Sequence, residues 1–115
     1  MKPIAVERAR AFSVKIYIAG PIDVAKQILR RECMRVGLCV TIEPTTYIYT
    51  GGEESGYVVG LINYPRFPKE TTEITQRASG LGRILMEETH QQSFTVVTPE
   101  ESIFVSRRSE DVVKQ

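Results

Sequence analysis

The chain has 115 residues, of which 42% are hydrophobic and 25% are charged, and its formal net charge is +1. This composition is typical of one soluble globular domain. So small a net charge argues against general electrostatic attraction to duplex nucleic acid or to an anionic membrane. No run approaches the roughly 20 apolar residues of a membrane-spanning helix. We therefore expect one domain over residues 1–115, located in the cytoplasm, with neither duplex nucleic acid nor a membrane as partner.

A strand and a helix are the first regular elements predicted. Apolar and other residues alternate in Ser13–Ala19, which indicates a strand with one buried face. From about residue 21 to residue 36, apolar side chains recur with a 3.6-residue period, so we predict an amphipathic helix there. Gly37 is the expected left-handed residue that ends it.

A β-hairpin is predicted at the centre of the chain. Residues 38–43 alternate as a strand, and Pro44 implies a bulge or an edge position because proline cannot donate to a sheet ladder. Three glycines within residues 51–56 separate this strand from the next, which is typical of a hairpin whose loop is longer than two residues. The second strand ends before Pro65.

The remainder of the chain predicts a second helix and two strands. The helix is expected from about residue 68 to residue 90, and it contains Gly80 and Gly82. Each glycine costs a helix about 1 kcal/mol relative to alanine, so we expect compensation by close packing on the sheet or on another subunit. We favour the sheet for one glycine, and the reason for the other stays open. Strands are predicted at residues 93–97 and 102–107, joined by a turn.

These elements follow the order βαββαββ. Two helices with a single apolar face each are expected to pack on one face of a mainly antiparallel sheet. The predicted fold class is therefore α+β, related to the ferredoxin-like arrangement. The opposite face of the sheet carries Tyr and Thr side chains, and we expect it to be either solvated or a subunit interface.

The sequence contains no catalytic signature that we can identify. His90, the single histidine, is interpreted as a solvated residue at a helix end rather than as a general base. Glu53 and Glu54 lie beside the hairpin glycines, where they would repel phosphate, so we interpret this stretch as a plain turn. There is no nucleophile elbow, metal-ligand cluster or Walker-type loop. We therefore expect no catalytic residue, no metal, no cofactor and no enzyme activity.

The strongest candidates for ligand binding follow the second hairpin strand. Asn63, Tyr64, Arg66 and Phe67 are held by Pro65 and the proline at residue 68, which restrict the backbone. A guanidinium pairs with phosphate and stacks on bases. This stretch therefore suits a flat, polar, anionic ligand. The alternative is that its aromatic rings anchor the loop to the core and that its amide caps it.

One short segment is similar to an enzyme family. Residues 15–22, KIYIAGPI, look like the opening strand and turn of nucleoside 2-deoxyribosyltransferases. Those enzymes are parallel α/β folds with a glutamate nucleophile, whereas a hairpin follows directly here. The similarity keeps a small nucleoside-processing enzyme as one alternative function.

The layout as a whole resembles the Thoeris anti-defence proteins of phages, the small sponge type. The resemblance spans roughly residues 15–108 and rests on the hairpin YIYTGGEESGYVVGLINYPRFP, followed by a helix. It implies a cup-shaped homo-oligomer, a hexamer, in the host bacterial cytoplasm. Such a protein binds and sequesters immune signals without cleaving them, and so blocks TIR/Thoeris or CBASS-type signalling. The implied partners are isomers of cyclic ADP-ribose, including glycocyclic ADP-ribose, and cyclic oligonucleotides.

The resemblance also implies how the ligand is held. Bases in that family stack on an aromatic ring and an arginine, and by position the arginine is Arg107 or Arg108, with Asp111 nearby. No aromatic residue of the second helix matches, so Phe67, Tyr64 or Phe94 is the substitute for the stacking ring. A ferredoxin-like oligomerisation or regulatory module without a ligand is the remaining alternative. The complete predicted ligand-binding set is Asn63, Tyr64, Arg66, Phe67, Phe94, Arg107, Arg108 and Asp111.

Overall fold

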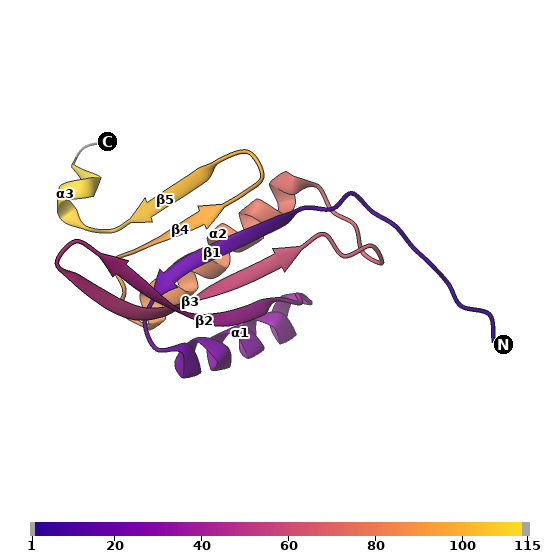
Figure 1. The fold of residues 1–115 in the computed structure, drawn as a ribbon, viewed down its shortest axis with the longest axis horizontal. Helices are drawn as coiled ribbons and strands as arrows, with labels where there is room; N and C mark the ends of the chain where they lie inside the picture. Colours follow the sequence, from indigo (N-terminus) through magenta and orange to yellow (C-terminus); the bar gives the residue numbers. More distant parts are fainter. Residues whose placement is uncertain (1, 114–115) are drawn as a thin grey trace.

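The computed structural model of the protein describes residues 2–113. Its five strands form one sheet in the spatial order β2-β3-β1-β4-β5, and every neighbouring pair is antiparallel (Figure 1). The predicted α+β class with a mainly antiparallel sheet is confirmed. The elements in chain order are β1 (Ser13–Ala19), α1 (Ile22–Val36), β2 (Thr41–Tyr49), β3 (Gly52–Ile62), α2 (Thr71–Glu88), β4 (Ser93–Val97), β5 (Ser102–Ser106) and α3 (Ser109–Val112).

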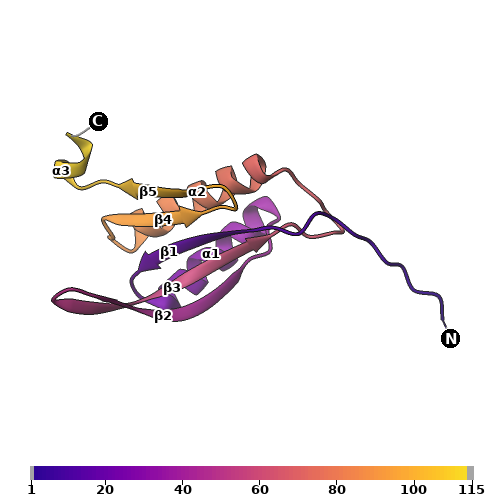
Figure 2. The ribbon, with the colours of Figure 1, turned by 45° about the horizontal axis from the view of Figure 1, so that its top comes forward.

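The two long helices cover the same face of the sheet (Figure 2). The alternation in β1 explains this layering, since Val14, Ile16 and Ile18 are each at most 2% exposed and point toward the helices. Burying this much apolar surface is the main favourable contribution to the stability of the domain. The helices complete the core with Ala25, Ile28 and Leu29 of α1 and with Ile74, Ala78, Leu81, Leu85 and Met86 of α2.

An ion-pair cluster joins α1 to α2. Arg31 donates to Glu88 at 2.9 Å and to Glu32 at 3.0 Å, and Arg35 donates to Glu32 at 2.7 Å. The Arg35 and Arg31 guanidinium groups hold the pKa of Glu32 below its usual value, and Arg31 does the same for the pKa of Glu88. Glu32 can therefore stay charged although it is almost fully buried.

The central hairpin differs from the prediction at its turn. Tyr49 pairs with Gly52, so the loop contains only residues 50–51, the second of which is a glycine with a φ of 89°. The expectation of a longer loop was wrong because Gly56 belongs to β3 rather than to the turn. Its lack of a side chain is needed inside the sheet, since a Cβ there would lie 2.5 Å from the carbonyl oxygen of Ile18.

The sheet face opposite the helices carries no helix among the described residues. One row of side chains crosses this face from edge to edge, and the strand register places Glu43, Val58, Tyr17, Thr95 and Phe104 in it. β2, which contains a proline, forms one edge of the sheet, as expected. A subunit interface on this face stays a prediction.

The two glycines of α2 have different surroundings. A Cβ on Gly82 would lie 2.3 Å from the Phe94 ring, so the helix approaches β4 closely at this position. This confirms that one helical glycine is needed for packing against the sheet. A Cβ on Gly80 would meet nothing within 4 Å, so the same reason does not apply there.

Three element boundaries were predicted imperfectly. β2 begins at Thr41, and α2 begins at Thr71 rather than at residue 68. β5 ends at Ser106, one residue before the predicted end, although the backbone N–H of Arg107 still donates to the carbonyl of Gln92 in the same register. No helix in the described part of the chain has the length and apolar character needed to cross a lipid bilayer.

Candidate functional site

The structure divides the predicted binding residues into two groups at opposite ends of the sheet. β1 pairs its first residue, Ser13, with Ile62 and its last residue, Ala19, with Gly56. The stretch that contains residues 63–67 therefore follows one end of this strand pair. The connection from α2 to β4 and the end of β5 lie at the other end (Figure 1).

In the first group, Asn63 has a clear structural role. Its Nδ2 donates to the carbonyl of Arg10 at 2.9 Å, and its Oδ1 accepts from the backbone N–H of Lys69 at 2.8 Å. Asn63 is 8% exposed, so both interactions satisfy polar groups that have little access to water. This agrees with the alternative that the amide caps the loop.

Of the other candidates in this loop, Tyr64 is partly buried, and Arg66 and Phe67 are exposed. The Tyr64 hydroxyl lies 3.2 Å from the Cys39 sulfur, and this contact raises the pKa of Tyr64 above its ordinary value. The Arg66 guanidinium lies over the Phe67 ring at 5.4 Å, and that ring is 64% exposed. Phe67 therefore does not anchor the loop to the core.

In the second group, two residues support the fold. Phe94 is 2% exposed and packed against Gly82, so its ring is not available to stack on a base. Arg107 donates from Nε to the carbonyl of Gln91 at 2.8 Å and from Nη2 to that of Met86 at 3.3 Å. It thereby satisfies carbonyl groups at and just beyond the C-terminal end of α2, where a cation is favoured.

Arg108 is held at the end of β5 by polar neighbours. Its Nη1 donates to the Ser93 hydroxyl at 3.2 Å and lies 4.0 Å from the Asp111 carboxylate. That carboxylate also accepts from the Ser106 hydroxyl at 2.5 Å. Ser93 and Asp111 together restrain the Arg108 guanidinium.

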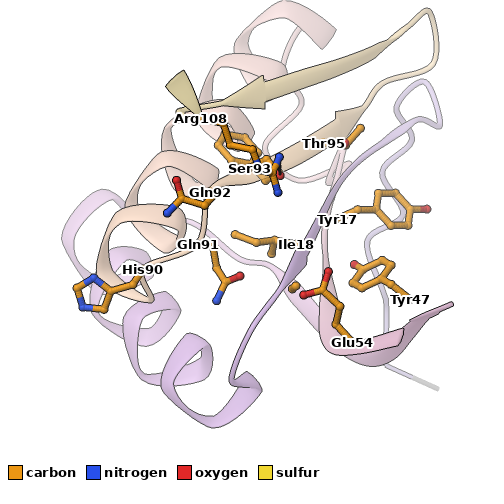
Figure 3. Close-up of a pocket in the computed structure, with 12 residues that line it drawn as sticks. Tyr17, Ile18, Tyr47, Glu54, His90, Gln91, Gln92, Ser93, Thr95 and Arg108 are labelled. Carbon is orange, nitrogen blue, oxygen red and sulfur yellow. Dashed lines mark hydrogen bonds between the residues drawn. The ribbon is translucent and has the colours of Figure 1, made fainter. Parts of the chain in front are cut away.

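Arg108 lines a cavity of about 360 Å³, which we call the Tyr17–Arg108 cavity (Figure 3). It lies at the end of β1, between the β2–β3 hairpin and the segment that leads from α2 into β4. Its volume is within the range of about 300–1,000 Å³ that is usual for small-molecule sites. The polar side chains that line it include Tyr17, Tyr47, Glu54, Gln91, Ser93 and Arg108.

The strand register explains why the tyrosines and the glutamate meet in this cavity. Tyr17 lies on the open face of β1, and Tyr47 and Glu54 are directly paired across the hairpin. Gly56 provides room for one of the rings, because a Cβ there would lie 2.6 Å from Cε2 of Tyr47. The Tyr47 hydroxyl donates to the carbonyl of Tyr57 at 2.8 Å, which fixes this ring, and burial raises its pKa.

The cavity is lined by an acidic and a basic side chain and by the rings of two tyrosines. Figure 3 shows the Glu54 carboxylate near the two tyrosines and Arg108 on the opposite side. Within residues 2–113, Glu54 has no hydrogen-bond or ion-pair partner. The arrangement can therefore hold a ligand that carries a cation, an anion and a planar ring.

His90 lines the same cavity from an unusual backbone conformation. Its φ is 58°, a left-handed value that is uncommon for a residue other than glycine. Figure 3 shows its imidazole directed away from Glu54 and from the two tyrosines. His90 therefore shapes the connection from α2 to β4 rather than joining the polar groups inside.

The sequence reasoning did not select Tyr17, Tyr47 or Glu54. A usable signal was present, since the alternation in β1 and β2 places both tyrosines on the open face of the sheet. Glu54 was dismissed because it would repel phosphate. That argument excludes a phosphate ligand only, and it does not exclude a cationic one.

No protein-family model and no curated protein matches this sequence. Two solved structures match. The first, a phage SAM lyase in its apo state, is 19% identical, with a TM-score of 0.64 over 91% of this chain and 98% of the other. The second, a phage SAM lyase in complex with S-methyl-5'-thioadenosine, is 16% identical, with a TM-score of 0.58 over 91% of this chain and 96% of the other. At these identities the likeness shows the fold.

These structures contradict the expectation of a non-enzymatic sponge for cyclic ADP-ribose or cyclic oligonucleotide signals. Both matched structures are named as phage SAM lyases, and the compound bound in one is S-methyl-5'-thioadenosine. The expectation of a sponge rests on the lack of an acid–base pair in the sequence, and that lack does not exclude a reaction. A resemblance based on the order of elements and one hairpin also does not distinguish a sponge from another small α+β protein with a different function. Membership of the Thoeris anti-defence family is not tested by this comparison, nor is a homo-oligomer, and both stay predictions.

The similarity to nucleoside 2-deoxyribosyltransferases is confined to one strand and turn. β1, which contains most of the matching residues 15–22, pairs antiparallel with both β3 and β4. A parallel α/β fold is therefore excluded for this sheet.

Proposed function

We propose that the protein is a lyase that cleaves SAM (S-adenosylmethionine) and releases S-methyl-5'-thioadenosine, with the Tyr17–Arg108 cavity as its active site. Two observations support the proposal. The fold is shared with phage SAM lyases over nearly the full length of both chains. The cavity also contains side chains whose charges and rings match the substrate. This second observation is independent of the comparison with the solved structures.

The reaction breaks the bond between the sulfonium sulfur and Cγ of the methionine part. The bonding electron pair leaves with sulfur, which becomes the neutral thioether of S-methyl-5'-thioadenosine. The carbon side is completed in one of two ways. The substrate's own carboxylate attacks Cγ and forms a cyclic ester, or a base removes a Cβ proton and a double bond forms. Neither route requires a protein nucleophile.

Glu54 carries the proposal, because it is a carboxylate with no partner among residues 2–113, beside two tyrosines in a cavity of suitable size. It would hold the cationic part of the substrate, the ammonium or the sulfonium group. A cation beside tyrosine rings is further stabilised by about 0.5–2 kcal/mol. In the elimination route, Glu54 is also the carboxylate in the lining that would take the Cβ proton.

Arg108 and the tyrosines complete the assignment. The Arg108 guanidinium would bind the substrate carboxylate, a pairing that guanidinium geometry favours. Tyr17 or Tyr47 would stack on the adenine, and such stacking contributes about 1–3 kcal/mol per base in other proteins. Gln91 and Ser93, which also line the cavity, provide further polar atoms for the substrate.

The test is to incubate the purified protein with SAM and to follow S-methyl-5'-thioadenosine by liquid chromatography. We expect its release in repeated turnovers, together with an equal amount of a four-carbon product. Identification of that product by mass spectrometry separates the cyclic ester from the unsaturated amino acid. SAM recovered intact from the protein after long incubation would contradict the proposal.

A further inference from the structure

We infer that a groove between α1 and α2 is a second ligand site, which takes a small amphiphilic anion, that is, an apolar chain or ring with one carboxylate-like group. The groove consists of two cavities of about 540 Å³ and 170 Å³. Leu38 and Arg77 line both cavities, so the two adjoin. The site does not depend on the function proposed above, because it shares no residue with the Tyr17–Arg108 cavity.

The larger cavity has apolar walls. Leu61 and Ile62 come from the end of β3, and Ile74 comes from the first turns of α2. At the mouth, Ile62 is 44% exposed and Phe67 is 64% exposed. A concave site of this size with mainly apolar walls and a few polar groups is typical of a small-molecule site.

The smaller cavity is lined by a glycine that packing does not explain. Gly80 lies inside α2, where glycine is a poor helix former, and a Cβ at this position would meet nothing within 4 Å. Gly82, in contrast, is required by the nearby Phe94 ring. The absence of a side chain at Gly80 keeps the groove open along the helix, next to Leu81 and Ile84.

The charges at the mouth of the larger cavity select an anion. Arg66, Lys69 and Arg77 all line it. Lys69 and Arg77 share one carboxylate, that of Glu73, at 3.8 Å and 3.5 Å. Arg66 has no carboxylate partner within the described chain, and it lies over the Phe67 ring. The lining of the larger cavity thus contains three cations and no carboxylate, so an anionic head group fits here while the apolar part of the ligand enters the groove.

The test uses decanoate, a soluble ten-carbon carboxylate, titrated into the ¹⁵N-labelled full chain and followed by amide chemical shifts. We expect saturable binding, with the shifted amides confined to the groove. Decyltrimethylammonium has the same chain length and the opposite charge, and we expect its affinity to be at least about tenfold lower. Similar binding of both compounds, or no saturation at millimolar decanoate, would overturn the proposal.

Two variants with matched controls locate the site. Gly80→Leu places a side chain in the smaller cavity, and we expect it to weaken decanoate binding about tenfold or more while the protein stays folded, since leucine favours a helix. Gln76→Leu adds the same side chain at an exposed position of α2 and should leave the affinity unchanged. Arg66→Gln should weaken binding about tenfold, whereas Arg83→Gln, an exposed cation of α2, should not.

Other occupants of the groove predict different results. If a second copy of the chain fills it, Gly80→Leu changes the mass in light scattering and leaves decanoate affinity unaltered. If the surface instead recognises a lipid bilayer, the protein sediments with anionic vesicles and does not respond to free decanoate. Either result would overturn the proposal, as would amide shifts that map to the Tyr17–Arg108 cavity.

Discussion

The two ends of the sheet use the same kinds of side chain in different ways. At the end of β3, the Asn63 side chain is occupied by backbone groups, whereas Arg66 makes no hydrogen bond within residues 2–113 and lines the groove between α1 and α2. At the end of β1, Glu54 has no partner in the described part of the chain and lines a cavity that Arg108 also lines. Polar and aromatic residues after a strand are therefore not sufficient to identify a site. What matters is whether their polar atoms are already used by the fold.

A second difference concerns how each end is built. The stretch at residues 63–67 is continuous in sequence, and its prolines make it conspicuous. The Tyr17–Arg108 cavity combines side chains from β1, the hairpin, the segment before β4 and the end of β5. Such a site depends on strand pairing between distant segments, and the rigid sheet beneath it holds these side chains in place.

The sharpest test of this comparison is Glu54→Gln. If Glu54 holds the cationic part of SAM, removing its charge should lower the rate of S-methyl-5'-thioadenosine release about 100-fold, the scale found when one preorganised electrostatic group is lost. The measurement is kcat/KM for SAM cleavage.

Glu53→Gln is the matched control, because Glu53 pairs with Ile48 and so points to the other face of the hairpin. It should retain nearly full activity. Equal losses in the two variants would mean that the hairpin as a whole, and not the Glu54 carboxylate, supports the reaction.

The two glycines of α2 extend the comparison to stability. Gly82→Ala forces a Cβ against the Phe94 ring, beneath the wall of the Tyr17–Arg108 cavity, and we expect it to cost about 1–3 kcal/mol. The Cβ added by Gly80→Ala would meet no atom within 4 Å, and we expect this variant to stabilise the protein by about 1 kcal/mol. Urea unfolding of both variants measures these changes. Destabilisation by Gly80→Ala would show that this glycine has a structural role that its surroundings do not reveal.

Much of the fold could be predicted from local pattern. The limits of β1 and the left-handed Gly37 at the end of α1 agree with the sequence, because alternation and helix capping are local effects. The hairpin turn could not be placed in the same way. Gly56 looks like a turn residue, but it is required by atoms of Ile18 and Tyr47, which approach it only in the folded sheet.

The candidate site could be predicted only in part. Arg108 was selected from its place at a strand end, and it does line the cavity. Phe94 was selected as an aromatic ring, but a ring that fills the space above Gly82 belongs to the core. Glu54 and the two tyrosines were missed, because their joint position follows from strand register and not from nearness in sequence.

The smallest expected effect concerns the other end of the sheet. Asn63→Ala removes two hydrogen bonds, to the carbonyl of Arg10 and from the N–H of Lys69, and leaves both backbone groups short of a partner. We expect a loss of about 1–2 kcal/mol in the free energy of unfolding, measured by urea unfolding, with kcat/KM for SAM cleavage unchanged. Tyr64→Phe, which removes only an exposed contact with Cys39, should change neither quantity measurably. If Asn63→Ala instead leaves stability intact and lowers SAM cleavage, the active site extends to the end of β3, and the division between the two ends of the sheet is wrong.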